Sequence, residues 1–298
     1  IWGSSPSDVF GVCVGGKIIH YDGFSWMTQQ SGTEKWLKGV WGSSENDVFA
    51  VGNDGTILSY DGFTWSEMEP VTTANLRGIW GNAHDYIYTV GDRGTILNYD
   101  GESWADITSG TDVDLYAVWG SSDDNIYAVG VQGTIVYFDG ASWSEMTSGT
   151  GVDLYAVWGS SENDVYAVGV QGTIVHFDGA SWSEMTSNTG VDLYGIWGSS
   201  DDNVYAAGAQ GTILHYDGVE EQRCVLENLY KGDSVKLAAL RNYRDTLLNT
   251  TLHGRLVVWT YYATSPYLKK IIPNNSLLRP ILKKSIEGIL PFLRVKID

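Results

Sequence analysis

A strict 39-residue period constrains this sequence more than any other feature. A Trp-Gly pair recurs six times at this spacing without an insertion, at Trp2, Trp41, Trp80, Trp119, Trp158 and Trp197. A second tryptophan follows each of the first five at a fixed offset, at Trp26, Trp65, Trp104, Trp143 and Trp182. A period of this length is typical of a fold built from one repeated supersecondary unit, so the unit is interpreted first.

Each unit reads as four short strands separated by turns. In the unit that begins at Leu154, the segments LYAVWG and DVYAVG alternate with period two, which is typical of strands and not of helices. TIVHF and SWSEM follow, and Asp178-Gly179 between them is a strong hairpin signal. Four antiparallel strands in about 40 residues correspond to one propeller blade. We therefore predict an all-β propeller of six four-stranded blades, with the tryptophans buried between blades.

The chain begins at Ile1, inside the first predicted strand and without a methionine. We interpret it as truncated at the N-terminus, which leaves a larger ring with further blades upstream as an alternative. Under this interpretation, the missing signal peptide is no argument for a cytoplasmic protein. We expect an extracellular or cell-surface location.

Charge divides the sequence into two modules. Residues 1–218 contain 5 basic and 29 acidic residues, a net charge of −24, whereas residues 219–298 contain 13 basic and 7 acidic residues, a net charge of +6. The acidic repeats exclude nucleic acids and anionic membranes as electrostatic partners. No apolar stretch is long enough for a transmembrane helix.

We place the domain boundary between residues 1–226 and residues 227–298. Residues Glu221 to Leu226 stand where the sixth unit lacks its fourth strand, and we expect a weak outer strand there. Beyond them, apolar residues recur at helical spacing, which predicts a small all-α module. We expect this basic helical tail to dock on the acidic propeller or on a partner. A closed ring would bring Cys13 near Cys224, so a disulfide and two free thiols are both open.

The units resemble a bacterial β-propeller repeat with the text VWGSS-x-x-DVYAVG-x-x-GTI-x-HYDG-x-x-W, common in secreted or surface proteins. The SYDGFTW segment from Ser59 to Trp65 also resembles a shortened Asp-box of sialidase-like propellers. That resemblance implies a structural role within the turn for Asp22, Asp61, Asp100, Asp139, Asp178 and Asp217. Photosystem assembly factors are related propellers of the same broad class, and they display an arginine patch that this acidic chain lacks.

The tail is similar to a bacterial C-terminal module named for a Cys-Phe-Ile box. The segments that carry the resemblance are LRNYRD from Leu240 to Asp245 and YYATSP from Tyr261 to Pro266. The box itself reads Cys224-Val225-Leu226 here, a departure from the family pattern. The resemblance implies a sorting or surface-attachment role.

Catalytic and metal chemistry have little support in the repeats. A sialidase-like hydrolase needs several arginines to clamp a substrate carboxylate, and residues 1–218 contain only Arg77 and Arg93. The oxygen-rich turns, such as Glu162-Asn163-Asp164, would suit calcium, but they lack the length of an EF-hand loop. We interpret them as solvated turns and predict no metal and no cofactor, with calcium as the alternative.

Residues that interrupt the repeat pattern are the better candidates for a binding site. They are Lys35, Trp36 and Lys38 in the first link and Arg77, His84, Asp85, Tyr86 and Arg93 in the third unit. We predict a non-enzymatic scaffold that recognises a protein or a glycan. A lectin-like propeller with repeated sugar sites and a sialidase-like glycoside hydrolase are the alternatives.

Overall fold

The computed structural model describes residues 1–217. The predicted outer strand at residues 221–226, the predicted helical module and Cys224 lie outside the described residues. Cys13 lies within them and is exposed. No helix among residues 1–217 has the length and apolar character needed to cross a membrane.

The described chain forms six antiparallel sheets in sequence order, each of which is one blade. Blade one contains β1 (Trp2–Ser5), β2 (Asp8–Val12), β3 (Ile18–Tyr21) and β4 (Trp26–Gln29). Blade two contains β5 (Leu37–Ser44), β6 (Asp47–Gly52), β7 (Ile57–Tyr60) and β8 (Trp65–Glu67). Blade three contains β9 (Leu76–Ala83), β10 (Tyr86–Gly91), β11 (Ile96–Tyr99) and β12 (Trp104–Ile107).

The remaining blades repeat this order. Blade four contains β13 (Leu115–Ser122), β14 (Asn125–Gly130), β15 (Ile135–Phe138) and β16 (Trp143–Met146). Blade five contains β17 (Leu154–Ser161), β18 (Asp164–Gly169), β19 (Ile174–Phe177) and β20 (Trp182–Met185). Blade six has three described strands, β21 (Leu193–Ser200), β22 (Asn203–Gly208) and β23 (Ile213–Tyr216). The predicted six-bladed all-β propeller fold is confirmed, with three described strands in its last blade.

A short 3₁₀ turn joins the second and third strands of every blade. These turns are η1 (Val14–Gly16), η2 (Asn53–Gly55), η3 (Asp92–Gly94), η4 (Val131–Gly133), η5 (Val170–Gly172) and η6 (Ala209–Gly211). The last residue of the turn is always glycine. At Gly55, φ is +69° and a Cβ would lie 1.8 Å from the Thr72 carbonyl oxygen, so no larger residue fits.

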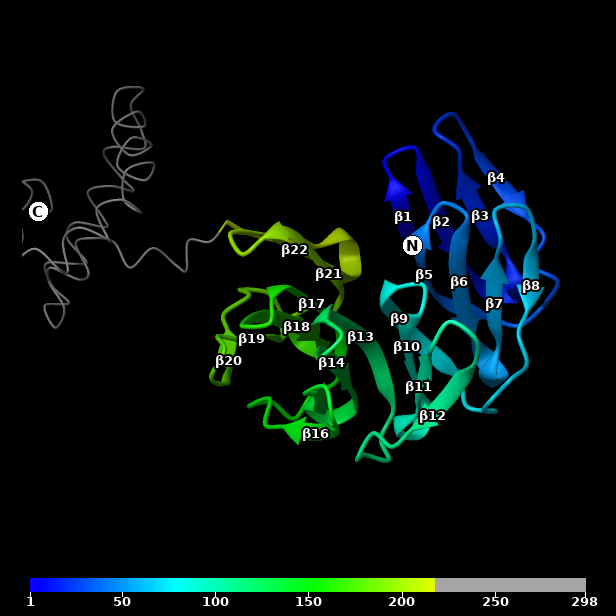
Figure 1. Cartoon of the computed structure of the whole chain (residues 1–298). Coiled ribbons are helices and arrows are strands. Elements are labelled where there is room, and N and C mark those ends of the chain that lie inside the picture. The colour runs from blue at the N-terminus through cyan, green and yellow to red at the C-terminus, as the bar shows by residue number, and fades with distance from the viewer. Residues whose placement is uncertain (218–298) are drawn as a thin grey trace, which may run out of the picture. The chain divides into compact units, whose positions relative to one another are not determined.

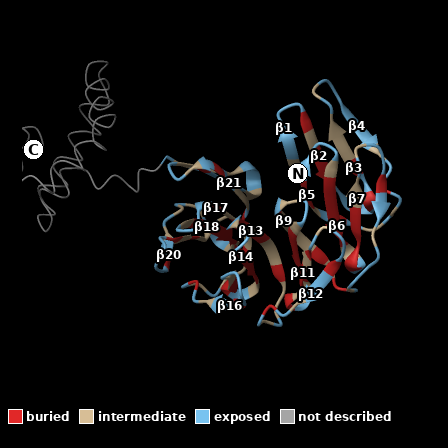
Figure 2. Ribbon diagram, viewed as in Figure 1, coloured by how far each residue is buried: buried red, intermediate tan, exposed pale blue. Residues whose placement is uncertain are grey.

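The first strand of each blade lies towards the middle of the array, and the fourth strand of blades one to five lies outside (Figure 1). Neighbouring blades contact one another mainly through their first strands. Buried residues concentrate in the strands, whereas the turns are mostly exposed (Figure 2). The core is thus a series of joints between blades.

The Trp-Gly pair explains how each joint fits together. The ring of Trp41 lies against Gly81 of the next blade, where a Cβ would be 2.7 Å from the ring. The same contact joins Trp2 to Gly42, Trp80 to Gly120, Trp119 to Gly159 and Trp158 to Gly198. Glycine is therefore required beside each tryptophan because the ring occupies the space of a side chain.

In blades two to five, the second tryptophan packs against the preceding blade. Trp143 forms an edge contact with Tyr88 of blade three, with ring centroids 5.9 Å apart. The tryptophan in this position is 7–9% exposed in blades two to five, but Trp26 is 51% exposed. Trp197 at the other end of the array is 61% exposed. The outer faces of blades one and six are therefore open in the described structure.

Matched tryptophan substitutions test the joints. Trp143→Ala leaves a cavity between blades three and four, and we expect it to lower the free energy of unfolding by about 3–5 kcal/mol. Trp26→Ala removes the same side chain from an exposed face, and its effect should be about 1 kcal/mol or less. Chemical denaturation of both variants measures the difference, and equal effects would contradict the packing described here.

Candidate functional site

The first strands of blades two to six share a β-bulge at the same position. In blade four, Leu115 pairs with Gly130 and Ala117 pairs with Val129, so Tyr116 is the extra residue between them. The corresponding bulge residues in the other blades are Lys38, Arg77, Tyr155 and Tyr194. A bulge re-aims its side chain and is often found near functional sites. We call these five residues the bulge ladder.

The bulge corrects one expectation about the strand faces. Strict alternation in blade five would place Leu154 and Val157 on opposite faces, but both are buried in the same core cluster. The extra residue at Tyr155 shifts the strand by one position, which brings Leu154 and Val157 to the same side. The tyrosine is consequently half-buried and does not belong to that cluster.

The four members of the bulge ladder from Arg77 to Tyr194 contact one another in succession. The Arg77 guanidinium carbon lies 5.0 Å from the centroid of the Tyr116 ring, which is a cation–π contact. The ring centroids of Tyr116 and Tyr155 are 5.6 Å apart, and those of Tyr155 and Tyr194 are 5.7 Å apart. A continuous row of one cation and three rings therefore crosses blades three to six.

Two carboxylates hold Arg77 in place. Its Nε donates to Asp92 Oδ1, and its Nη2 donates to Asp114 Oδ2 at 3.3 Å. Asn75 Nδ2 also donates to Asp92 Oδ2, at 2.6 Å. The arginine is thus fixed over Tyr116 by charge-assisted hydrogen bonds.

The pKa values of Lys38, Tyr116 and Tyr155 are shifted from their ordinary values. Partial burial lowers the pKa of Lys38, and the nearby positive charge of Arg77 lowers it further. Burial raises the pKa of Tyr116 and of Tyr155, and the carboxylate of Asp153 adds to both shifts. Tyr116 and Tyr155 are therefore neutral hydroxyl donors at physiological pH.

An aspartate two residues before each ladder tyrosine ties neighbouring blades together. Oδ1 of Asp114 accepts a hydrogen bond from the backbone N–H of Arg93, at 2.9 Å. Asp153 and Asp192 accept equivalent bonds from Gln132 and Gln171, at 2.9 and 2.8 Å. Each donor residue has a positive φ of 55–56°. Sequence reasoning missed these aspartates, although their fixed place two residues before each tyrosine was a visible signal.

The sequence-predicted site residues divide between two ends of the blades. Arg77 lies at the start of β9, whereas Asp85 follows its end, and eight residues of strand span about 25 Å. Trp36, which is 56% exposed, precedes β5 at the same end as Arg77, and Arg93 belongs to the η3 turn there. Arg93 itself is exposed, and its backbone bonds to Asp114. The structure thus places Lys35, Trp36 and Arg93 at the end of the blades that carries Lys38 and Arg77 of the bulge ladder.

His84, Asp85 and Tyr86, which the sequence also predicted, lie at the opposite end. His84 Nδ1 lies 2.9 Å from both carboxylate oxygens of Asp47 in blade two. The Tyr86 hydroxyl donates to the Asp123 carbonyl oxygen of blade four at 2.5 Å. Asp85 is exposed beside them. These contacts join blades two, three and four, so His84 and Tyr86 stabilise the packing between blades.

The oxygen-rich turns form local hydrogen bonds. Asp164 accepts from Ser160 Oγ at 2.6 Å and lies 2.7 Å from His176 Nε2. Asp8 pairs with Ser4 and His20 in the same way. Within residues 1–217, no three His, Cys, Asp or Glu side chains are grouped so that they could hold a metal ion.

The Asp-box-like aspartates cap their own turns. Oδ1 of Asp178 accepts hydrogen bonds from the backbone N–H groups of Ala180 and Ser181, both at 3.0 Å. Asp22, Asp61, Asp100 and Asp139 make the same pair of bonds. These backbone bonds hold the pKa of each carboxyl group below its usual range.

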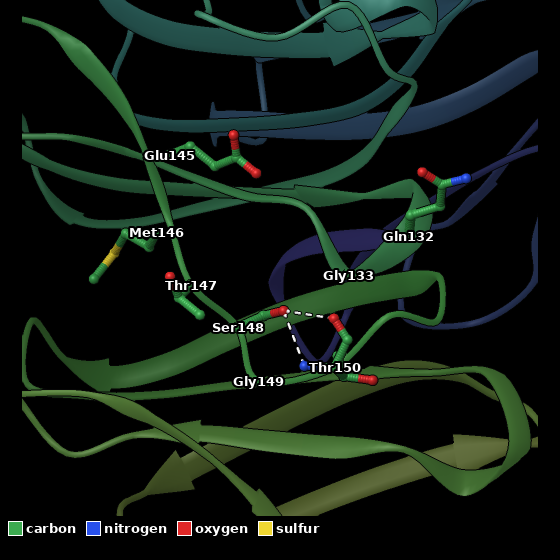
Figure 3. Close-up of a pocket in the computed structure, with 8 residues that line it drawn as sticks. All are labelled: Gln132, Gly133, Glu145, Met146, Thr147, Ser148, Gly149 and Thr150. Atoms are coloured by element: carbon green, nitrogen blue, oxygen red, sulfur yellow. Dashed lines mark hydrogen bonds between the residues drawn. The ribbon is translucent and has the colours of Figure 1, made fainter.

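A shallow surface hollow of about 540 Å³ lies beside the η4 turn of blade four (Figure 3). Ser148 Oγ in its wall is engaged with the backbone of Thr150 (Figure 3). A similar hollow of about 520 Å³ recurs beside Gln171 in blade five. Neither hollow is lined by an aromatic ring, so both lack a stacking platform for a sugar.

The comparison with solved structures supports the propeller fold. A structure of YCF48 from Cyanidioschyzon merolae matches with a TM-score of 0.57 and 17% identity, over 71% of this chain and 77% of that chain. A structure described as YCF48 bound to D1 peptide matches with a TM-score of 0.42 and 16% identity, over 71% of this chain and 90% of that chain. Family models and curated proteins give no match. The chain is therefore similar to YCF48 in its propeller fold.

The turn-capping aspartates predict a specific pH dependence. Their folded-state pKa is depressed, so their contribution to stability is present above the unfolded value near 3.8 and is lost as the pH falls through the folded value. In Asp139→Asn/Asp178→Asn, the amide oxygen still accepts the backbone bonds but does not titrate. We expect its melting temperature to fall less than that of the wild type between pH 5 and acid pH. Circular dichroism measures the melting temperature of both proteins at each pH. An equal fall in the two proteins would refute this role.

Proposed function

We propose that this chain is a non-enzymatic β-propeller scaffold that binds a protein partner along the bulge ladder. The observation that carries the proposal is the continuous row from Arg77 to Tyr194, in which each bulge side chain contacts the next. Tyrosine and arginine are among the side chains most enriched at the energetic centres of protein interfaces.

The variation of the bulge ladder supports a binding role. The residue before each bulge is always leucine and is at most 4% exposed, as packing between blades requires. The bulge position itself holds lysine, arginine or tyrosine, so the fold accepts different side chains there. A position that varies in size and charge between otherwise strict repeats is more readily explained by recognition than by packing.

The environment of Arg77 favours binding over hydrolysis. A sialidase-like site needs arginines that are free to clamp a substrate carboxylate. Arg77 is already engaged by Asp92 and Asp114. An arginine that is already paired in this way does not meet that requirement, which favours protein binding.

Partner capture with matched variants tests the proposal. The purified full chain, tagged and crosslinked in an extract of the cells that encode it, should enrich a protein partner. In Tyr116→Ala/Tyr155→Ala, which shortens two neighbouring ladder residues, we expect recovery to fall by roughly tenfold or more, the size of effect typical of hot-spot residues. Direct binding of the purified partner then gives the change in dissociation constant.

The control is Phe24→Ala/Phe63→Ala, which removes two aromatic rings that are 94% and 90% exposed at turn tips away from the bulge ladder. It should retain wild-type recovery. Circular dichroism and melting temperature establish that both variants are folded. Equal recovery by the ladder variant and the control would refute the proposed surface.

A further inference from the structure

A hollow of about 200 Å³ lies between blades five and six. In blades two to five, the second tryptophan of each blade is buried at the corresponding joint with the preceding blade. Counted by the 39-residue period, the same position of the sixth unit holds Glu221. The sixth unit therefore has a carboxyl group where the others have an indole ring, and a carboxylate is costly to bury among apolar side chains.

The lining of the hollow repeats the core that surrounds a tryptophan in the neighbouring joint. Between blades four and five, Trp182 belongs to a cluster of buried apolar side chains. Residues one period after members of that cluster line the hollow, among them Tyr166, Ile174, Val204, Ala206, Leu214 and Tyr216. We call these six residues the indole socket. The hollow thus has the lining of an occupied joint and lacks the ring that fills one.

The two rings that flank the tryptophan keep their geometry in the indole socket. Beside Trp182, the ring centroids of Tyr127 and Phe177 are 5.9 Å apart, with an interplanar angle of 53°. The corresponding centroids of Tyr166 and Tyr216 are 6.0 Å apart, with an angle of 49°. Trp182 lies 6.0 Å from Tyr127 and 5.5 Å from Phe177, so both rings contact the indole. The indole socket is therefore preformed, which lowers the cost of binding.

Apolar surface that an indole ring covers in the other joints is open at the indole socket. Val175 of blade five is fully buried, whereas Leu214, at the same position of blade six, is partly exposed. Covering such surface with an aromatic ring removes on the order of 150–250 Å² of that ring from water, which favours binding.

We propose that the indole socket binds a tryptophan side chain of a partner protein, carried on a strand beside β23. In blade five, β19 pairs with β20, and Phe177 lies opposite Trp182. β23 is the outermost described strand of blade six, so a partner strand beside it would place its tryptophan opposite Tyr216. None of the five bulge-ladder residues lines the hollow, so this is a second site that does not depend on the ladder.

A labelled peptide provides the test, with fluorescence anisotropy as the measurement of its binding to the purified full chain. Its text is that of residues 180–187, Ala-Ser-Trp-Ser-Glu-Met-Thr-Ser, because this segment carries Trp182. We expect saturable binding, and the matched peptide with alanine in place of tryptophan should bind about tenfold more weakly or worse. Equal binding of the two peptides, or no binding of the tryptophan peptide at millimolar concentration, would overturn the inference.

Two adjacent alanines of β22 provide matched variants of the protein. Ala206 lines the indole socket, whereas Ala207 is exposed and points to the opposite face of the strand. Ala206→Phe places a ring in the indole socket, and we expect it to weaken binding of the tryptophan peptide by about tenfold or more. Ala207→Phe adds the same ring to the same strand and should change the affinity by less than about twofold. Equal weakening in the two variants would contradict the assignment of the site.

Melting temperature gives a second measurement, which does not use the peptide. Ala167 is the equivalent of Ala206 in blade five, and it is fully buried in the joint that Trp182 fills. Ala167→Phe overpacks that joint and should lower the melting temperature measured by circular dichroism, whereas Ala206→Phe should leave it near the wild-type value. An equal fall in the two variants would mean that the indole socket is already filled, for example by part of residues 219–298, and would overturn the inference.

The bulge-ladder variant separates this site from the proposed function. Neither Tyr116 nor Tyr155 lines the hollow, so Tyr116→Ala/Tyr155→Ala should bind the tryptophan peptide with wild-type affinity. If this variant weakens the peptide as much as Ala206→Phe does, the peptide binds elsewhere and the indole-socket assignment fails. Partner capture tests the ladder by itself, so either proposal can fail while the other stands.

Discussion

The contact between each tryptophan ring and the glycine of the next blade is the constraint on which this structure depends. A four-stranded sheet cannot bury both of its faces alone, so every blade relies on its neighbours. Trp80 fills the space that a side chain at Gly120 would need. This contact fixes how closely two first strands approach. It therefore also fixes the separation of the residues that those strands carry.

Close approach of the first strands makes the bulge ladder possible. At Gly78, a Cβ would lie 2.9 Å from the Cα of Ala117 in the next blade. Because the strands are this close, Arg77 and Tyr116 can stack although they are 39 residues apart in sequence. The joint that stabilises the propeller thus also determines the geometry of the candidate binding surface.

The repeat pattern was sufficient to predict the blades and their joints, because period-two alternation and regularly spaced tryptophans report directly on burial. It could not predict the ladder, because a bulge depends on the pairing register between two strands. Tyr155 and Val157 look equivalent in an alternating strand, but the register shift at Tyr155 separates them. Arg77 was identified as an interruption of the pattern. Tyr116 was not, because it follows the pattern.

The bulge ladder combines a repeated side chain in three blades with different side chains in two others. Blades four to six repeat the same tyrosine and aspartate, so a ligand whose side chains have a matching period can engage several blades at once and gain effective concentration. Lys38 and Arg77 interrupt this series at one end. The two ends of the row therefore differ, with cationic side chains at one end and tyrosine rings at the other. The same 39-residue unit can therefore keep an identical Trp-Gly contact in every joint and still vary the side chain at its bulge position.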